Sequence, residues 1–551
     1  MNKIEEIKRR KDGLDVLGDI YRYSKLGPQT ITPDDEPLFR WYGIYSQRPA
    51  EDGFFMVRIR IPGGDLTPAQ LRLIAALADE HGRGLADITV RQNIQLHWVR
   101  IESLADILDR LREAGLSTTE ACGDCVRNIL NCPVSGVDES ELYDTTALVR
   151  EVNDFFVGNR DFSNLPRKFK IAITGCAVRC VYPEINDIGI FAVREEGRTL
   201  FRARIGGGLS TTPRFSKDLE ILMEPEEVVD LCGAVASVFR DEGNRENRKR
   251  ARLKFLIEKW EIPRFRAEVE ARLGRSLRRS KQPEAAPIIK RDRSHLGIHR
   301  QREAGLYYAG ISILGGRTSA SDLARLAAVA EEYGSGRMRT TNTQNIVLLD
   351  IDERRLVALR RDLKAGGFDC EPSWSRKAVI ACTGIQFCKL AIAETKNRAA
   401  ELSSHLEQTI NLDDSVRISV TGCPNSCGQH HICDVGLEGS VTTIDGVKRE
   451  TFQVFLGGGV GAHETFGRRI GVRVPSEQVA ESLARLFAQY KEGRIGSETF
   501  QEFCLRHSDK ELARYMTESE ARSQKPEARI SCELSRSLQS GRNPKSTSTG
   551  F

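Results

Sequence analysis

Four cysteines in the second half of the chain have the type and spacing of metal ligands. They form two pairs: Cys382 with Cys388, and Cys423 with Cys427. Each pair follows a short apolar stretch rich in β-forming residues, 378–381 and 418–420, so we expect the thiols on loops at strand ends. Thiolates are soft ligands, and four of them suit zinc or an iron–sulfur centre.

Three interpretations of these cysteines compete. The spacings C-x5-C and C-x3-C together depart from the C-x2-4-C spacing that is usual for structural zinc. A disulfide is disfavoured because nothing in the sequence indicates export, and cytosolic thiols are kept reduced. An iron–sulfur cluster held by two distant pairs is therefore the interpretation that we favour.

Three motifs around these cysteines carry a resemblance to a known family: CTGIQFC, Glu394-Thr395-Lys396 and TGCPNSCGQ. In this order they resemble the sirohaem and 4Fe-4S nitrite/sulfite reductases, and the resemblance runs from about Phe39 to Phe503. It implies one 4Fe-4S cluster on the four cysteines and one sirohaem. It also implies that Cys427 bridges the cluster to the sirohaem iron.

Four basic residues match the substrate-pocket pattern of that family: Arg91, Arg127, Lys168 and Lys170. Reducing sulfite to sulfide, or nitrite to ammonia, takes six electrons and several protons, and cationic side chains can hold the anion by charge-assisted hydrogen bonds. We expect the arginines to clamp the substrate and the lysines to anchor it and relay protons. The lysines are two residues apart on an expected strand, so both would point to one face. Taken alone, an arginine in a strand is most often a surface or salt-bridge residue.

The densest basic run, residues 245–259, has three interpretations. It would form the solvated face of a helix, or bind nucleic acid, which a net charge of only +5 does not favour. The third is contact with a cofactor that carries many carboxylates, as sirohaem does. We assign Arg252 and Lys254 to that role, and we predict no nucleic-acid partner.

The motifs divide between two substrates. Lys170 in RKFK favours sulfite, because the plant-type nitrite enzymes of the family tend to carry Asn at that place. The segments RQNIQLHW, TTEACGDC and ARLKFLI also resemble ferredoxin-dependent sulfite reductases, whereas CTGIQFC, ETK and GCPNSCGQ are more like nitrite reductase. We predict reduction of sulfite to sulfide, with reduction of nitrite to ammonia as the alternative.

The electron donor is expected to be a separate protein, because the sequence contains no flavin or NADPH module. The loop GGGVGAHE at 457–464 resembles a dinucleotide-binding loop, but its repeat counterpart GGGLSTT lacks the pattern. We interpret it as a loop against the tetrapyrrole. The basic balance favours a small acidic donor, and we predict reduced ferredoxin, with a separate flavoprotein as the alternative.

The location of the protein is predicted from what the sequence lacks. The first 15 residues are charged and lack the apolar segment of a signal peptide. No stretch reaches the roughly 20 apolar residues of a membrane-spanning helix. We expect a cytoplasmic monomer with no membrane contact.

The elements that must position these residues recur in two copies. Strand and helix patterns alternate over residues 54–115, with one strand expected over 86–99 that carries Arg91, and the same order returns after residue 307. Gln92-Asn93-Ile94 pairs with Gln344-Asn345-Ile346, and Thr174-Gly175-Cys176 echoes Thr421-Gly422-Cys423. The chain is therefore predicted to be an internal duplication. The resemblance implies an α+β fold with two ferredoxin-like half-domains and two larger α/β domains that hold sirohaem and the 4Fe-4S cluster.

The predicted boundaries follow from this repeat. They are an N-terminal arm (1–38), the first ferredoxin-like half-domain (39–117), the first nitrite/sulfite reductase domain on the substrate side (118–275), a connection (276–302), the second ferredoxin-like half-domain (303–370), the second nitrite/sulfite reductase domain with cluster and sirohaem (371–516), and a disordered tail (517–551).

The first half carries five cysteines of its own: Cys122, Cys125, Cys132, Cys176 and Cys180. Cys132 falls near the repeat equivalent of Cys382, but the equivalent of Cys388 falls near Asp138, which has no thiol. Either these cysteines hold a second cluster that uses Cys122 or Cys125, or they are a relic of the duplication, which we favour. Four further cysteines stand singly and are interpreted as inert: Cys232, Cys370, Cys504 and Cys532.

Overall fold

The computed structural model describes residues 2–195, 197–284, 294–413 and 415–517. Two ferredoxin-like units contain the same elements in the same order. The first consists of β2 (Phe55–Ile59), α3 (Pro68–His81), β4 (Leu85–Ile88), β5 (Ile94–Val99) and α4 (Leu104–Glu113). The second consists of β11 (Leu306–Ile311), α8 (Ala320–Tyr333), β13 (Met338–Thr340), β14 (Ile346–Asp352) and α9 (Leu356–Ala365). Helices α3 and α8, strands β5 and β14, and helices α4 and α9 each begin 252 residues apart, which confirms the predicted duplication.

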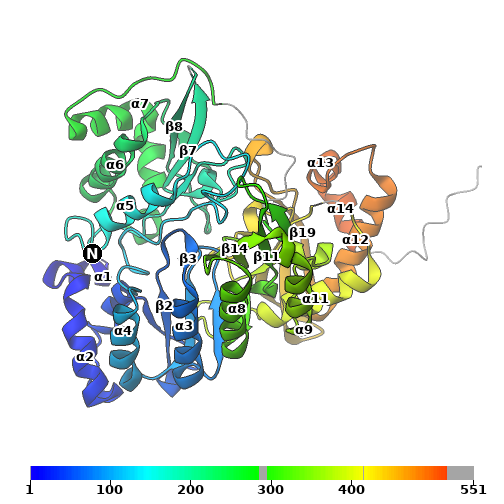
Figure 1. The fold of residues 1–551 in the computed structure, drawn as a ribbon, viewed down its shortest axis with the longest axis horizontal. Helices are drawn as coiled ribbons and strands as arrows, with labels where there is room; N and C mark the ends of the chain where they lie inside the picture. The colour runs from blue at the N-terminus through cyan, green and yellow to red at the C-terminus, as the bar shows by residue number, and fades with distance from the viewer. Residues whose placement is uncertain (1, 196, 285–293, 414, 518–551) are drawn as a thin grey trace, which may run out of the picture.

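The two ferredoxin-like units exchange their edge strands. Strand β12 (Arg317–Ser319), from the second half, pairs antiparallel with β4 and completes the first sheet, in the order β1-β2-β5-β4-β12 with β1 (Ile44–Ser46). Strand β3 (Asp65–Leu66) pairs with β13 and completes the second sheet, β10-β11-β14-β13-β3 with β10 (Gly297–Arg300). Helices α3 and α8 pack side by side over one shared apolar core (Figure 1).

The expected strand that was to carry Arg91 is interrupted by a turn. The pattern at 86–99 predicted one strand, but the chain turns between β4 and β5, where the amide of Gln92 donates to the carbonyl of Thr89 at 3.0 Å. Gln92 has a left-handed φ of 56°, far from the extended backbone of a regular strand. Gln344 repeats this turn with a φ of 68°. Arg91 therefore lies in a turn, and its position in a strand was predicted wrongly.

The two larger units are built on parallel strands that lead into antiparallel ones. In the first, β6 (Ile171–Thr174) runs parallel to β7 (Ile188–Glu195), and β8 (Arg198–Ile205) and β9 (Lys217–Asp218) follow antiparallel. In the second, β15 (Val379–Ala381), β16 (Ile418–Thr421) and β17 (Val435–Ile444) are parallel, and β18 (Val447–Leu456) and β19 (Arg468–Pro475) follow antiparallel. The carboxyl ends of parallel strands meet at one edge, and both cysteine loops start at that edge.

Helices cover these two sheets. The first unit has α5 (Thr146–Phe156), α6 (Val228–Glu242) and α7 (Leu253–Leu273). The second has α10 (Trp374–Ala378), α11 (Lys396–Thr409), α12 (Val479–Gly493), α13 (Phe500–Arg506) and α14 (Asp509–Thr517). Together with the two duplicated ferredoxin-like units, this arrangement confirms the predicted α+β class.

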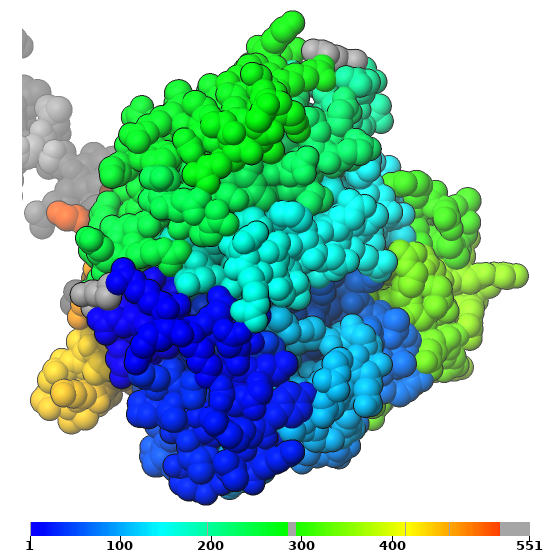
Figure 2. Space-filling model, turned by 90° about the vertical axis from the view of Figure 1, so that its left-hand side faces the viewer, coloured from blue at the N-terminus to red at the C-terminus, as the bar shows by residue number. Residues whose placement is uncertain are grey.

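The N-terminal arm is helical and forms part of the core. The arm predicted over residues 1–38 contains helices α1 (Lys3–Arg10) and α2 (Leu17–Leu26), and Ile7 and Ile20 are buried in the first ferredoxin-like core. The ammonium of Lys8 donates to the carbonyl of Leu165 at 2.8 Å, which ties the arm to the neighbouring unit. In Figure 2 the arm lies directly against that unit (dark blue beside cyan).

Some predicted features fall outside the described residues. These are most of the C-terminal tail with Cys532, and part of the 276–302 connection. Within the described ranges, no helix combines the length and the apolar character needed to cross a membrane.

Candidate functional site

The two cysteine pairs of the second half meet at the carboxyl ends of β15 and β16. Cys382 follows β15 directly, and its amide donates to the carbonyl of Val420 in β16 at 3.1 Å. The amide of Gly422 donates to the sulfur of Cys382 at 3.2 Å, so the second loop touches the first thiol. Gly384 turns the first loop with a left-handed φ of 74°. These contacts bring the two pairs together, as the sequence predicted.

The four thiols are close enough to influence one another electrostatically. Burial raises the pKa of Cys382 to about 12, and the neighbouring Cys427 and Cys423 raise it further. Burial also raises the pKa of Cys388 and of Cys423, with Cys427 adding to both shifts. Thiols with raised pKa values stay protonated near neutral pH unless a metal displaces the protons. Their number, type and convergence fit a 4Fe-4S cluster.

Cys427 is the exposed member of this set, and it faces the first half of the chain. Burial and the charge of Arg252 lower the pKa of Lys168 to about 7, and the Cys427 thiol opposes that shift. The predicted cluster ligands of one half and the predicted substrate residues of the other half therefore border the same space.

The two lysines flank Phe169, just before β6. The amide of Arg127 donates to the carbonyl of Phe169 at 2.8 Å, which places Arg127 beside both lysines. Burial, followed by the charges of Arg91 and Lys168, lowers the pKa of Lys170 well below the ordinary lysine value. The lysines thus precede the strand on which the sequence placed them, yet they lie close to each other as expected.

The two predicted arginines are held by neutral acceptors. Arg91 donates to the Asn186 side chain at 2.9 Å and to the carbonyl of Ile171 at 3.3 Å. Burial and the charge of Arg127 lower the pKa of Arg91 to about 9. Arg127 donates to the carbonyl of Gly123 at 2.7 and 3.0 Å. A carbonyl group does not neutralise the positive charge of a guanidinium group. The charges of Arg91 and Arg127 are therefore left available to bind an anion.

Arg252 and Lys254 begin helix α7 but take different directions. Arg252 forms a two-bond ion pair with Asp187, at 2.7 and 3.2 Å. Lys254 donates to the carbonyls of Leu209 and Thr212 at 2.8 and 2.5 Å, in the loop that follows Gly206 to Gly208. Arg252 therefore borders the lysines, whereas Lys254 holds the glycine-rich loop that would back a large cofactor.

Sequence reasoning missed Arg58, which belongs to the same group of charges. It donates to the sulfur of Cys122 at 2.8 Å from strand β2. Burial and the Cys122 thiol raise the pKa of the Tyr45 phenol, while Arg127 and Arg58 oppose the shift, so these four groups are neighbours. The available signal was the pair of arginines, Arg58 and Arg60, inside the otherwise apolar run FFMVRIRIP.

We call the six cations the basic group: Arg58, Arg91, Arg127, Lys168, Lys170 and Arg252. Asp187 is the carboxylate that pairs within it. Burial of several cations around one carboxylate is unfavourable unless an anion completes the site. A cofactor with many carboxylates and a small oxyanion would supply that charge, so the residues fit sirohaem and its substrate.

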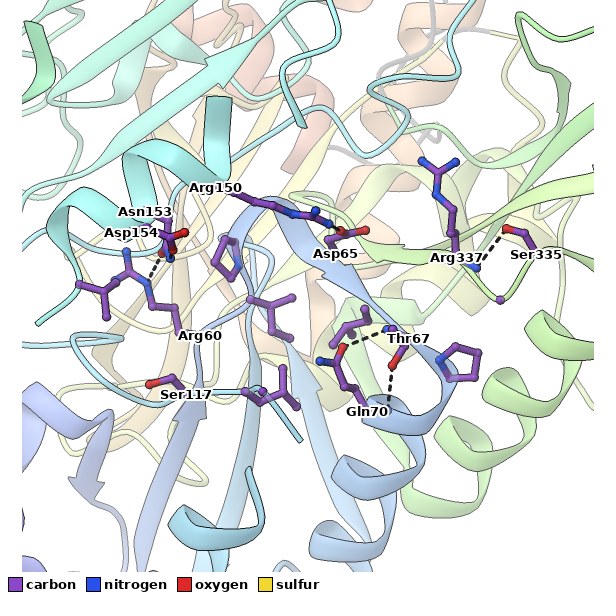
Figure 3. A pocket seen from close by; sticks show the side chains of 18 of the residues that line it. Arg60, Asp65, Thr67, Gln70, Ser117, Arg150, Asn153, Asp154, Ser335 and Arg337 are labelled. Atoms are coloured by element: carbon purple, nitrogen blue, oxygen red, sulfur yellow. Dashed lines mark hydrogen bonds and ion pairs between the residues drawn. The ribbon is translucent and has the colours of Figure 1, made fainter. Parts of the chain in front are cut away.

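A separate surface pocket of about 750 Å³ lies away from the cysteine loops. Figure 3 shows Arg60 at the left, Arg150 and Asp65 near the middle and Arg337 at the right. The residues described as lining it include none of the predicted site residues. Several of its polar side chains are already paired, for example Arg60 with Asn153 at 2.9 Å. We do not place the substrate there.

Comparisons with known proteins agree with this geometry. The family model described as nitrite and sulphite reductase 4Fe-4S domain matches residues 122–277 and 375–503. The model described as nitrite/sulfite reductase ferredoxin-like half domain matches residues 47–114 and 299–366. These matches confirm the resemblance that the cysteine motifs indicated.

The similar proteins include some named as nitrite reductases and others named as sulfite reductases. A ferredoxin-nitrite reductase of Leptolyngbya laminosa is 39% identical over 503 residues, covering 89% of this chain and 97% of that protein. A sulfite reductase (ferredoxin) of Mycobacterium tuberculosis is 37% identical over 541 residues, covering 93% and 96%. The solved structure of the Mycobacterium tuberculosis NirA protein matches with a TM-score of 0.88 and 36% identity, covering 93% of this chain and 97% of that one. The chain belongs to the nitrite/sulfite reductase family, whose members are oxidoreductases that use sirohaem and a 4Fe-4S cluster.

Proposed function

We propose that the protein reduces a small oxyanion by six electrons, with sulfite as the preferred substrate and sulfide as the product. The observation that carries this proposal is the position of the basic group opposite Cys427. Nitrite reduction to ammonia is the alternative, and relatives with both names match at similar identity.

The residues would divide the work by their contacts. Cys382, Cys388, Cys423 and Cys427 would hold the cluster, with Cys427 also on the sirohaem iron, and Arg252 and Lys254 would support the sirohaem. When bound, the two cofactors supply electrons one at a time to the substrate. The chain's own task is to bind the anion, to keep it oriented and to deliver protons.

Arg91 and Arg127 suit anion binding because neither guanidinium group forms an ion pair with a carboxylate of the described residues. Lys168 suits proton delivery, because a group with a pKa of about 7 can both give and regain a proton near neutral pH. Lys170 adds a further, half-buried cation. Sulfite carries more negative charge than nitrite near neutral pH, so a pocket with this extra lysine favours sulfite.

The surface beside the cluster loop suits an acidic electron donor. Lys389 follows Cys388, is exposed, and donates to the hydroxyl of Ser46 at 2.7 Å. The Arg48 guanidinium donates to the carbonyl of Lys389 at 3.1 Å, so two cations lie together there. Leu390 is 68% exposed at the same place. We propose reduced ferredoxin as the donor, with a separate flavoprotein as the alternative, acting on a cytoplasmic monomer.

The deciding experiment compares kcat/KM for sulfite and for nitrite on purified holoprotein. Reduced ferredoxin is the donor, and reduced methyl viologen is the control donor that needs no protein docking surface. A sulfite-to-nitrite ratio well above one supports the proposal. A ratio well below one assigns the enzyme to nitrite. Turnover with viologen but not with ferredoxin would instead reject the proposed donor.

A further inference from the structure

The first half of the chain contains a second group of metal-ligand side chains, remote in sequence from the four cluster cysteines. The sulfurs of Cys132 and Cys180 and a ring nitrogen of His295 lie within 4.8 Å of one another, and all three residues are buried. The sulfur of Cys176 lies 3.9 Å from that of Cys180. Two thiols and one imidazole therefore converge, and the thiol of Cys176 lies beside them.

This group occupies the position that the duplication assigns to the cluster ligands. Cys132 comes two residues after Leu130, whose backbone forms a parallel bridge with the residue Ala172 of β6. Cys382 comes two residues after Ile380, which pairs in parallel with β16 in the same way. The two loops thus start at equivalent points of equivalent sheets.

One ligand differs between the copies. Cys176 and Cys180 have the C-x3-C spacing of Cys423 and Cys427, after matching strands β6 and β16. No thiol stands at the equivalent of Cys388. Within the described residues, His295 reaches this thiol group instead, from the segment that leads into β10.

We propose that this group binds one structural zinc ion, held by four side chains: Cys132, Cys176, Cys180 and His295. Three cysteines and one histidine form a usual closed zinc site. Zinc–sulfur bonds of about 2.3 Å in a tetrahedron hold the sulfurs about 3.8 Å apart. The separation between Cys176 and Cys180 is 3.9 Å, which matches a single ion. A 4Fe-4S cubane spreads its thiolates more widely than one ion does.

The surroundings suit a structural ion. The hydroxyl of Thr174 donates to the sulfur of Cys176 at 3.3 Å, as outer partners of zinc thiolates do. An apolar cluster encloses the thiols and includes Val178 of the first half with Val347 of the second ferredoxin-like unit. The side chain of Asn342 donates to the carbonyl of Cys180 at 2.8 Å across the same boundary. An ion here would fasten the two halves together.

Cys122 and Cys125 are not needed for this site. Cys122 accepts from Arg58 in the basic group, and Cys125 donates to the carbonyl of Cys122 at 2.8 Å. The structure therefore separates the five first-half cysteines into two sets with different surroundings.

The test measures zinc and iron per chain in purified holoprotein by mass spectrometry, and the zinc environment by zinc-edge X-ray absorption. We expect about one zinc per chain with three sulfur neighbours at about 2.3 Å and one nitrogen at about 2.0–2.1 Å. The variants Cys180→Ala and His295→Ala should each lose most of the zinc while keeping the absorption bands of the iron cofactors. Cys232→Ala is the matched control, because Cys232 is buried in α6 and has no role in the group.

Three results would overturn the proposal. One is a zinc content far below one per chain after growth with added zinc. Another is a zinc shell of nitrogen and oxygen alone, which indicates surface binding. The third is a Cys176–Cys180 disulfide, detected by peptide mass spectrometry of the unreduced protein. Wild-type content and absorption decide the matter even if the variants do not fold, and none of these readouts depends on the proposed substrate.

Discussion

Asp187 receives two hydrogen bonds from the guanidinium of Arg252, at 2.7 and 3.2 Å, in the middle of the basic group. The same carboxylate accepts from the backbone amide of Lys170 at 2.9 Å. One buried carboxylate therefore links the helix that begins near Arg252 to the segment that carries the two predicted substrate lysines. Its charge limits the repulsion among the surrounding cations.

The first prediction concerns Asp187→Asn. The substitution keeps the shape and the acceptor for Lys170, but it leaves Arg252 buried without its counter-charge. Breaking a buried pair in this way costs about 3–5 kcal/mol, so the midpoint of urea unfolding should fall clearly. Asp352→Asn, which removes a pair with Arg354 at the surface, should leave the midpoint nearly unchanged. Equal effects of the two variants would contradict the structural role given to Asp187.

Cys427→Ser tests the junction of the cofactors. If Cys427 joins the cluster to the sirohaem iron, the variant should lose turnover with reduced methyl viologen. Cys504→Ser, at a buried cysteine in α13, should keep activity. The readouts are the viologen-driven rate and the absorption spectrum. Wild-type rates in the Cys427 variant would remove this residue from the site.

Lys170→Asn tests the choice of substrate. Removing this half-buried cation should weaken the binding of sulfite, the more highly charged anion, more than that of nitrite. The sulfite-to-nitrite ratio of kcat/KM should therefore fall by about tenfold, or about 1.4 kcal/mol. The exposed Lys389→Asn serves as the control and should leave the ratio unchanged. An unaltered ratio in the Lys170 variant would place substrate selection elsewhere.

The proton-donor role of Lys168 predicts a pH dependence. A donor must be protonated, and the pKa of Lys168 is lowered to about 7 by burial and by Arg252. The sulfite kcat/KM should therefore decrease as pH rises through about 7. The corresponding decrease in kcat should occur at higher pH, because a bound anion stabilises the ammonium form of Lys168 and raises its pKa. Lys168→Met should abolish this pH dependence; an identical profile in the variant would assign the proton to another group.

The proposed docking surface predicts a donor-specific defect. Lys389→Glu reverses an exposed charge beside Cys388, so the KM for reduced ferredoxin should rise several-fold, most strongly at low salt. The rate with methyl viologen should not change, which separates docking from chemistry. Arg354→Glu, at another exposed cation, is the charge-matched control. An unchanged KM for ferredoxin would exclude this surface as its docking site.

The sequence was most informative where chemistry repeats. The C-x5-C and C-x3-C loops, the offset between Gln92 and Gln344, and the joint presence of Arg127, Lys168 and Lys170 were all visible as residue types at fixed spacing. Short patterns of that kind can be recognised without knowledge of the fold, because the residues of each ligand loop are close together in the sequence.

Other features of the fold and of the site could be recognised only in the three-dimensional structure. Strands β3 and β12 have two and three residues, too few for any periodicity, and their partners come from the other half of the chain. Arg58 looked like an ordinary strand residue until its contact with Cys122 placed it among the cations. His295 gave no signal, because a lone histidine in a charged connection becomes a candidate ligand only when folding brings three thiols to it.

The exchange of β3 and β12 has an evolutionary reading. Each ferredoxin-like sheet is completed by a strand from the other half. Two identical subunits exchange edge strands in the same way in a symmetric, strand-swapped dimer. A gene fusion of such a dimer would produce one polypeptide with a regular internal offset and an approximate twofold axis. After such a fusion, the two copies of the ancestral thiol loop no longer had to have the same sequence. One copy could then specialise while the other acquired different ligands.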